Sequence, residues 1–197
     1  MRMLALSSCV VMALAACQQA EAPASADGTD AAAPAATVTA EANVLTPEGL
    51  GPLRIGMMVP QLATVWGGLR VQPTDVMACQ IVEFADAPPG VKAFLNGGEV
   101  RHIILDRFST LKTDRGFGPG DDGAAIKADY GAAATVAPAK YDPPPAEEIM
   151  VWSNGDTSGA YIEDLTARGT RYNVGGDGKV ATVMAGGPTI QLVEGCG

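Results

Sequence analysis

The chain has 197 residues, of which 22 are acidic and 13 basic, and a formal net charge of −9 at pH 7. This length suits one ordinary domain or two small ones. The surplus of negative charge repels nucleic-acid phosphates and anionic lipid headgroups, and no run of Lys and Arg longer than two residues interrupts it. Composition therefore disfavours nucleic acid as a partner. Any membrane attachment has to come from lipid or from a spanning segment.

The N-terminus has the pattern of a secretory signal peptide. Met1 and Arg2 form a short basic region, and an apolar segment follows over residues 3–14. This segment is shorter than the roughly 20 apolar residues that a transmembrane helix needs. We therefore predict a cleaved signal peptide over residues 1–16.

The end of this segment resembles the lipobox of bacterial lipoproteins. Leu14-Ala15-Ala16-Cys17 places two small residues before a cysteine, whose thiol receives a diacylglycerol in that family. The resemblance implies a mature protein that begins at lipidated Cys17, with two or three acyl chains such as palmitate anchoring it stably. Gln18 stands where lipoproteins of the inner membrane tend to carry Asp, which implies the periplasmic face of the outer membrane. An ordinary secretory signal, cut at a nearby site, is the alternative.

The next segment is predicted to be a flexible linker. Residues 17–43 are mostly Ala, Pro, Thr, Ser, Glu and Asp, and Val38 is their only large apolar residue. Such a segment buries too little apolar surface to offset the entropy lost on ordering. We expect a disordered Ala/Pro-rich tether that lets the domain reach away from the bilayer.

Residues 44–197 are predicted to form the globular domain, and they contain an internal repeat. Residues 56–67 align without gaps with residues 120–131, so that Gly, an aliphatic residue, an aromatic residue and Gly recur at the same offsets. Chance matches in a Gly-rich chain are the alternative explanation.

Each copy of the repeat is predicted to be a short helix. The aliphatic and aromatic residues are four apart in both copies, Leu62 with Trp66 and Ile126 with Tyr130, so they share one helix face. The pair Asp121-Asp122 offers an N-cap for the second helix.

Strand and hairpin signals follow both copies. Hairpins are predicted at residues 91–105 and 171–184, and further strands at residues 80–84, 148–153, 159–165 and 189–193. The predicted fold class is α+β. It consists of two tandem units, residues 44–109 and 110–197, each a short helix packed on a small antiparallel sheet.

The segment from Gly51 to Gly67 resembles the helix-entry motif of the SmpA/BamE lipoproteins and the beta-lactamase-inhibitor-like proteins. The shared pattern is Gly, a short apolar strand, Gly-Met, a helix with an aliphatic residue, and an aromatic residue before Gly. Tandem copies are most similar to the inhibitor arrangement, although Asp121 replaces Met57 in the second copy. The resemblance implies a protein-binding module with no catalytic residues or cofactor to carry over.

Two cysteines remain in the predicted domain, Cys79 and Cys196. In an oxidising periplasm an isolated pair is most simply a disulfide. Two free thiols or a redox pair are the alternatives, but neither cysteine has the C-x-x-C spacing that lowers a thiol pKa.

Few residues offer acid–base or metal chemistry. His102 is the only histidine, and its place in a predicted strand favours a half-buried structural side chain over a catalytic one. Residues 154–165 partly match a calcium loop, but Leu165 occupies the place of the bidentate Glu, so a polar turn is favoured and no metal is predicted. The adjacent Glu147 and Glu148 point to opposite faces of a strand and are interpreted as solvated edge charges.

Aromatic residues near a long Pro-rich loop give the candidate binding surface. Residues 132–146 are predicted to form this loop, and Tyr141, Trp152 and Tyr161 are the chosen recognition residues, with burial in the core as the competing explanation.

The function predicted from these features is a non-catalytic, lipid-anchored module that binds an envelope protein or another envelope component, to assemble or to inhibit it. The alternative is an envelope hydrolase with a carboxylate site among Asp106, Asp114 and Asp129. A structural spacer that needs no partner is a third possibility.

Overall fold

A seven-stranded antiparallel sheet is the main element of the computed structural model, which describes residues 43–193. Across the sheet the strands are ordered β4 (Gln80–Val82), β5 (Val91–Asn96), β6 (Glu99–Leu105), β11 (Val180–Gly186), β10 (Gly169–Val174), β9 (Glu147–Trp152) and β8 (Ala134–Pro138). The predicted signal peptide, Cys17, the tether and Cys196 lie outside the described residues. None of the helices in residues 43–193 is long and apolar enough to cross a membrane.

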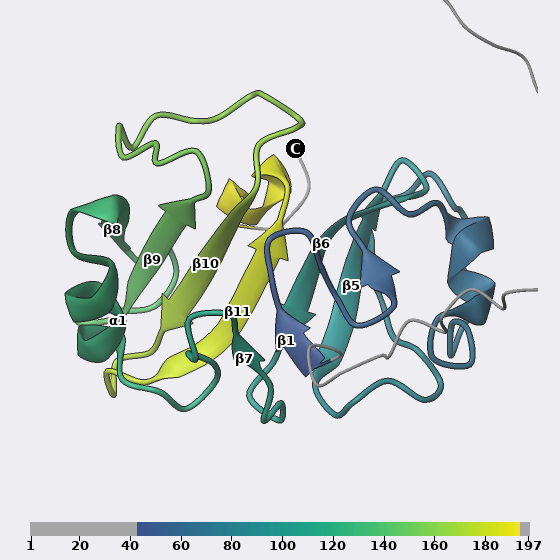
Figure 1. Cartoon of the computed structure of the whole chain (residues 1–197), viewed down its shortest axis with the longest axis horizontal. Helices are drawn as coiled ribbons and strands as arrows, with labels where there is room; N and C mark the ends of the chain where they lie inside the picture. The colour runs from purple at the N-terminus through teal and green to yellow at the C-terminus, as the bar shows by residue number, and fades with distance from the viewer. Residues whose placement is uncertain (1–42, 194–197) are drawn as a thin grey trace, which may run out of the picture. The chain divides into compact units, whose positions relative to one another are not determined.

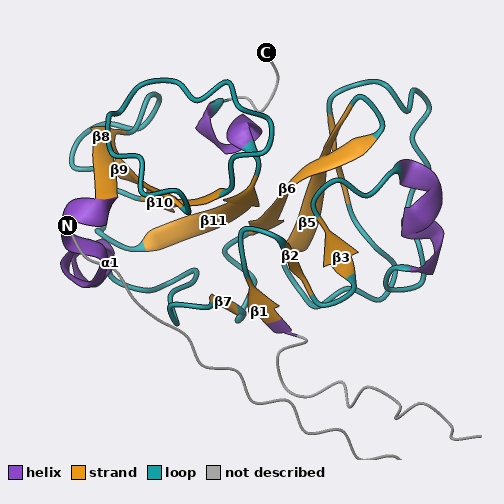
Figure 2. Ribbon diagram, turned by 45° about the horizontal axis from the view of Figure 1, so that its top comes forward, coloured by secondary structure: helices purple, strands orange, loops and turns teal. Residues whose placement is uncertain are grey.

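One face of the sheet carries the main hydrophobic core. Alternate strand residues such as Ala93, Ile103, Tyr172 and Val183 are fully buried on this face. Two pairs of short strands contribute apolar side chains to the same core: β1 (Val44–Leu45) pairs in parallel with β7 (Lys112–Thr113), and β2 (Gly49–Leu50) pairs with β3 (Leu53–Arg54). Figure 2 shows these short strands together on one side of the sheet.

The other face, called here the second face, is covered more thinly. A 3-10 helix, η4 (Pro188–Gln191), packs against β6, β10 and β11. Ile190 of η4, Trp152 and Ala167 form a small separate cluster of buried apolar side chains. The loop over residues 153–168, drawn in green above the strands in Figure 1, lies between β9 and β10.

The two copies of the sequence repeat differ in helix type. The second copy is the α-helix α1 (Gly123–Tyr130), and the predicted cap is confirmed because the Asp122 carboxylate accepts the Ala124 N–H at 2.8 Å. The first copy is a 3-10 helix, η2 (Val59–Thr64), preceded by Met58, whose side chain has no oxygen to accept that bond. A single 3-10 turn, η3 (Gly131–Ala133), follows α1.

The predicted fold class is therefore wrong. The described part of the chain is mostly β, with one continuous seven-stranded sheet and one short α-helix, instead of two separate helix-on-sheet units. The two hairpins were correctly predicted, but they pair with each other because β6 and β11 are neighbours. A prediction made one segment at a time gave no indication of this long-range pairing.

The two copies nevertheless make matching contacts. The Gly56 N–H donates to the Val100 carbonyl at 2.8 Å, and the Gly120 N–H donates to the Val180 carbonyl at the same distance. Each bond joins the glycine that opens a repeat to the first residues of the second strand of its hairpin.

The central strand pair is symmetric about one pair of residues. Gly98-Glu99-Val100 aligns with Gly178-Lys179-Val180 in the sequence. The same alignment makes Met184 the counterpart of Ile104. These two residues also pair with each other across β6 and β11. Both hairpins also shift register at matching places, after residue 94 in β5 and after residue 173 in β10.

Two strand predictions and one loop prediction fail. Residues 159–165 form part of a loop, and residues 189–193 begin in η4. The strand β8 lies inside residues 132–146, which were predicted to be a loop because they are rich in Ala and Pro. Pairing with β9 keeps this segment extended in spite of its weak β propensity.

Candidate functional site

A pocket of about 250 Å³ lies on the second face, next to the sheet edge formed by β8. We call it the aromatic pocket. It is lined by side chains of β8 and β9, by the loop over residues 153–168 and by η4: Thr135, Ala137, Glu148, Met150, Trp152, Gly159, Ala160, Tyr161 and Gln191. The β9 residues 148, 150 and 152 alternate along the strand, so they share one face and form the floor.

The polar end of this floor is a buried ion pair. The Arg171 guanidinium donates from Nη2 to Oε1 of Glu148 at 2.5 Å, and the Arg171 side chain is only 4% exposed. Its Nε donates to Asn173 Oδ1 at 2.7 Å, and Nη1 donates to the Ile190 carbonyl at 2.9 Å. Burial lowers the Arg171 pKa from its ordinary value, whereas the charge of Glu148 opposes that shift.

The loop that forms the opposite wall is held in place by its own polar side chains and by Gln191 of η4. The Asn154 and Asp156 carboxamide and carboxylate oxygens accept the N–H groups of Asp156 and Ser158 at 3.0 and 2.8 Å. The Gln191 amide accepts the Ile162 N–H at 2.8 Å and donates to the Ile162 carbonyl at 3.0 Å. The loop is thereby tied to η4, and Tyr161 is positioned beside the sheet.

These hydrogen bonds also account for the residues that resemble a calcium loop. The bonds from Ser158, backbone first, lower the pKa of the Asp156 carboxyl, and the Asn154 and Asp156 side-chain oxygens accept hydrogen bonds within turns. Within residues 43–193, no three His, Cys, Asp or Glu side chains are grouped so as to hold a metal ion.

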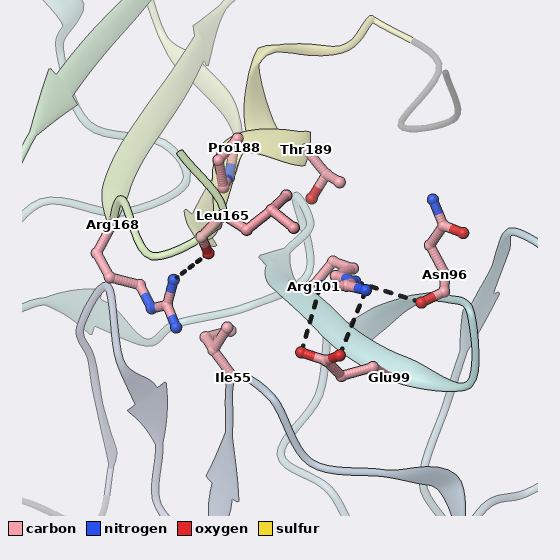
Figure 3. A pocket seen from close by; sticks show the side chains of 9 residues that line it. Ile55, Asn96, Glu99, Arg101, Leu165, Arg168, Pro188 and Thr189 are labelled. Carbon is pink, nitrogen blue, oxygen red and sulfur yellow. Dashed lines mark hydrogen bonds and ion pairs between the residues drawn. The ribbon is translucent and has the colours of Figure 1, made fainter. Parts of the chain in front are cut away.

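A second pocket, of about 150 Å³, contains two arginines (Figure 3). Arg101 faces Glu99, with guanidinium nitrogens 3.3 Å from the carboxylate oxygens. Arg168 donates to the Leu165 carbonyl at 3.1 Å, and its Nε lies 3.4 Å from a Glu48 carboxylate oxygen. Each cation faces a carboxylate, Arg101 within the pocket and Arg168 at Glu48, which is not among the residues that line it.

His102 lies in β6 and is fully buried. Its ring stacks on Phe94 with centroids 4.5 Å apart, and Nδ1 is 2.8 Å from the Thr189 hydroxyl. Burial, with a smaller contribution from the charge of Arg171, lowers the His102 pKa to about 3. The expectation of a half-buried histidine underestimated its burial, since only 1% of the residue is exposed.

Two of the three predicted recognition residues line the aromatic pocket, and the third does not. Tyr161 is 57% exposed and lines the aromatic pocket. Trp152 lines the same pocket but is only 7% exposed, as part of the cluster with Ile190. Tyr141 is 65% exposed in the loop between β8 and β9, beside the Lys140 ammonium, and is not among the residues that line the pocket.

The carboxylates of the alternative hydrolase site interact with two cations, Asp106 with Lys92 and both Asp114 and Asp129 with Arg115. Asp106 lies 3.1 Å from the Lys92 ammonium, and this pairing raises the Lys92 pKa. Asp129 of α1 binds Arg115 at 2.5 Å. Asp114 contributes to the raised Arg115 pKa, after the larger effect of Asp129.

Cys79 is not a free thiol, since it is bonded to a partner. Its predicted partner, Cys196, lies outside the described residues, so the pairing of these two residues stays a prediction.

Sequence reasoning missed the ion pair of Glu148 with Arg171. Glu147 and Glu148 do point to opposite faces, as predicted, but Glu148 is not a solvated edge charge: its side chain is 19% exposed. The missing information was which strand lies beside β9. Once β10 is the neighbour, Arg171 pairs opposite Met150 and is diagonal to Glu148.

Comparisons of the chain with protein-family models, with curated proteins and with solved structures found no match.

Proposed function

We propose that this chain is a non-catalytic, lipid-anchored module of the bacterial envelope that binds a partner protein at the aromatic pocket. The observation that carries the proposal is the construction of this pocket. A half-exposed Tyr161 lines the pocket with Met150 and Trp152, next to β8, which within residues 43–193 pairs only with β9. Exposed aromatic side chains beside an apolar floor are typical of protein-binding surfaces.

Two further features support binding over catalysis. The chain's single histidine is enclosed by Phe94 and Thr189, where it cannot reach a substrate. Two of the three candidate carboxylates, Asp106 and Asp129, are ion-paired with different cations instead of facing each other across a pocket.

Site-specific photo-crosslinking in cells tests the proposal. A benzophenone amino acid is placed at Tyr161 and, as a matched control, at Phe108, which is similarly exposed but belongs to the turn after β6. We expect one discrete protein adduct from position 161 and none from position 108. The same adducts from both positions, or none from position 161, would contradict a specific site there.

The anchoring part of the proposal has a separate test. Metabolic labelling with an alkyne-bearing palmitate should label the natural chain and leave a Cys17→Ser variant unlabelled. In the same variant the protein should disappear from the outer-membrane fraction. An unlabelled natural chain would contradict the proposed lipid anchor and would leave the proposed binding site untouched.

A further inference from the structure

We propose that the partner contributes an extended peptide segment, which pairs with the outer edge of β8 as an additional strand and inserts one aromatic or large aliphatic side chain into the aromatic pocket. This inference rests on the proposed function and names the class of partner that the same site takes. Strand addition obtains affinity from main-chain hydrogen bonds and specificity from pockets for alternate side chains.

The edge of the sheet at β8 is open in the part of the chain that the structure describes. β8 has five residues and pairs only with β9 there, and Figure 1 shows it as the last strand, beside α1. The opposite edge strand, β4, has three residues, and its continuation is covered: Arg70 N–H donates to the Glu83 carbonyl at 2.8 Å, and Leu69 bridges Phe84. A peptide therefore finds the longer row of unpaired groups at β8.

The register of β8 identifies which groups face outward. The Ala139 N–H donates to the opposed Ala146 carbonyl at 3.1 Å, so this pair is hydrogen-bonded. Hydrogen-bonded and non-bonded pairs alternate in an antiparallel ladder, which leaves the N–H and C=O of Val136 directed away from β9. Pro138 occupies the next outward position, where its missing N–H removes nothing from the β8–β9 pairing.

The same alternation places the pocket within reach of an added strand. Thr135 and Ala137 lie opposite Met150 and Glu148 and share the second face with them. Both β8 side chains are small, and Gly159 of the loop over residues 153–168 lies beside Thr135. A residue of the added strand opposite either position projects over the pocket.

The size of the pocket and the charge of the chain restrict the occupant. Its volume of about 250 Å³ is below the roughly 300–1,000 Å³ of pockets that enclose a whole drug-sized ligand, so it suits a side chain of a larger molecule. The net charge of −9 disfavours an acidic partner segment. A second copy of this chain pairing through β8 would present Thr135 or Ala137, which are too small to fill the pocket.

The test uses the full chain and fluorescein-labelled peptides read by fluorescence anisotropy. The probe is Lys-Thr-Thr-Thr-Trp-Thr-Thr-Thr-Lys, compared with peptides in which Ala or Glu replaces Trp and with one N-methylated at alternate residues. We expect the Trp peptide to bind at least about tenfold more tightly than the other three. Equal binding of the Trp and Ala peptides, or no binding of any peptide at about 1 mM, overturns the proposal.

Two variants of one residue test the strand pairing directly. Val136→Pro removes an outward N–H without removing a bond to β9, whereas Val136→Ala keeps that N–H. We expect the proline variant to lose binding by about tenfold or more and the alanine variant to bind like the natural chain. Unchanged circular dichroism shows that the proline variant folds; if it does not fold, the N-methylated peptide gives the deciding result.

The outcomes separate this inference from the proposed function. Crosslinking at position 161 together with unchanged peptide binding by Val136→Pro would overturn strand addition and leave the binding module standing. A dimer in sedimentation that Val136→Pro abolishes would assign the edge to a second copy of the chain and overturn the peptide proposal.

Discussion

His102 shows how a single buried side chain makes stability depend on pH. An unfolded histidine has a pKa of about 6.5, whereas burial lowers the folded pKa to about 3. Between these two values the unfolded chain binds a proton that the folded chain does not bind. The stability is therefore complete above about pH 6.5 and is lost as the pH falls toward 3.

The lowered His102 pKa predicts a difference in pH-dependent stability between the natural chain and His102→Asn. We expect the natural chain to lose about 2 kcal/mol more of its free energy of unfolding than the variant between pH 7 and pH 5. Asparagine keeps a polar atom near the Thr189 hydroxyl and does not titrate. Urea unfolding at both pH values measures the difference, which isolates His102 from the carboxylates that both proteins share. Parallel pH profiles would show that His102 is accessible to protons in the folded state.

The ion pair of Arg171 with Glu148 predicts strong coupling between two substitutions. Arg171→Met leaves a poorly exposed carboxylate unpaired, and Glu148→Leu leaves a buried cation, so each single change should cost about 3 kcal/mol or more. The double variant should recover much of this loss, because neither charge then remains buried. A double-mutant cycle from urea unfolding gives the coupling energy.

The exposed pair of Arg115 with Asp129 is the control for this cycle. Its side chains are 48% and 39% exposed, so solvent screening should make the coupling between the same two substitutions there much weaker than at the buried pair. Similar coupling at the two pairs would mean that burial does not strengthen the Arg171 contact.

At the scale of elements, the glycines that open the two repeats hold equivalent places. Gly56 has φ +89° and Gly120 has φ +85°, a region that side chains rarely adopt. A Cβ at Gly120 would meet nothing within 4 Å, and one at Gly56 would only touch Glu99. We expect Gly56→Ala and Gly120→Ala each to lower the free energy of unfolding by about 1–2 kcal/mol, through the backbone alone.

Gly176 provides the matched control. It is in the β10–β11 turn, its φ is not positive, and a Cβ there would also meet nothing within 4 Å. Chemical denaturation of Gly176→Ala should give a change within about 0.5 kcal/mol. A Gly120→Ala variant as stable as the natural chain would show that this turn relaxes to another conformation.

The elements also show what local sequence patterns can predict. The hairpins at β5–β6 and β10–β11 have Gly-rich turns between apolar runs, and Asp122 marks the start of α1, so these features could be predicted. The 3-10 character of η2 was missed because Met58, unlike Asp122, offers no capping oxygen. β8 was missed because its extended form depends on pairing with β9 and not on its own composition.

The candidate site was predictable only in part for a related reason. Tyr161 and Trp152 were selected as aromatic residues near a loop, and both line the pocket. The rest of the site depends on which strands are neighbours: Glu148 meets Arg171 because β9 lies beside β10, and Gln191 reaches Ile162 because η4 folds back on the second face. Neither contact leaves a local pattern in the sequence.

At the scale of the whole molecule, the two halves share one sheet and one core. β6 and β11 pair at the centre, and the main core joins Leu62 of the first repeat to Ile126 of the second. Neither half can lose its structure without exposing apolar surface on the other. Domains joined in this way are expected to unfold cooperatively in one step.

The two tryptophans test this cooperativity, because one lies in each half. Trp66 packs edge-on against Phe84 in the first half, and Trp152 belongs to the small cluster in the second. In Trp66→Phe the fluorescence reports only on the second half, and in Trp152→Phe it reports only on the first. For each variant we expect the urea midpoint from fluorescence to coincide with its own midpoint from far-ultraviolet circular dichroism, because the shared sheet links the halves. Midpoints that differ within one variant would mean that the central β6–β11 pairing opens before the rest, and the molecule would then behave as two domains.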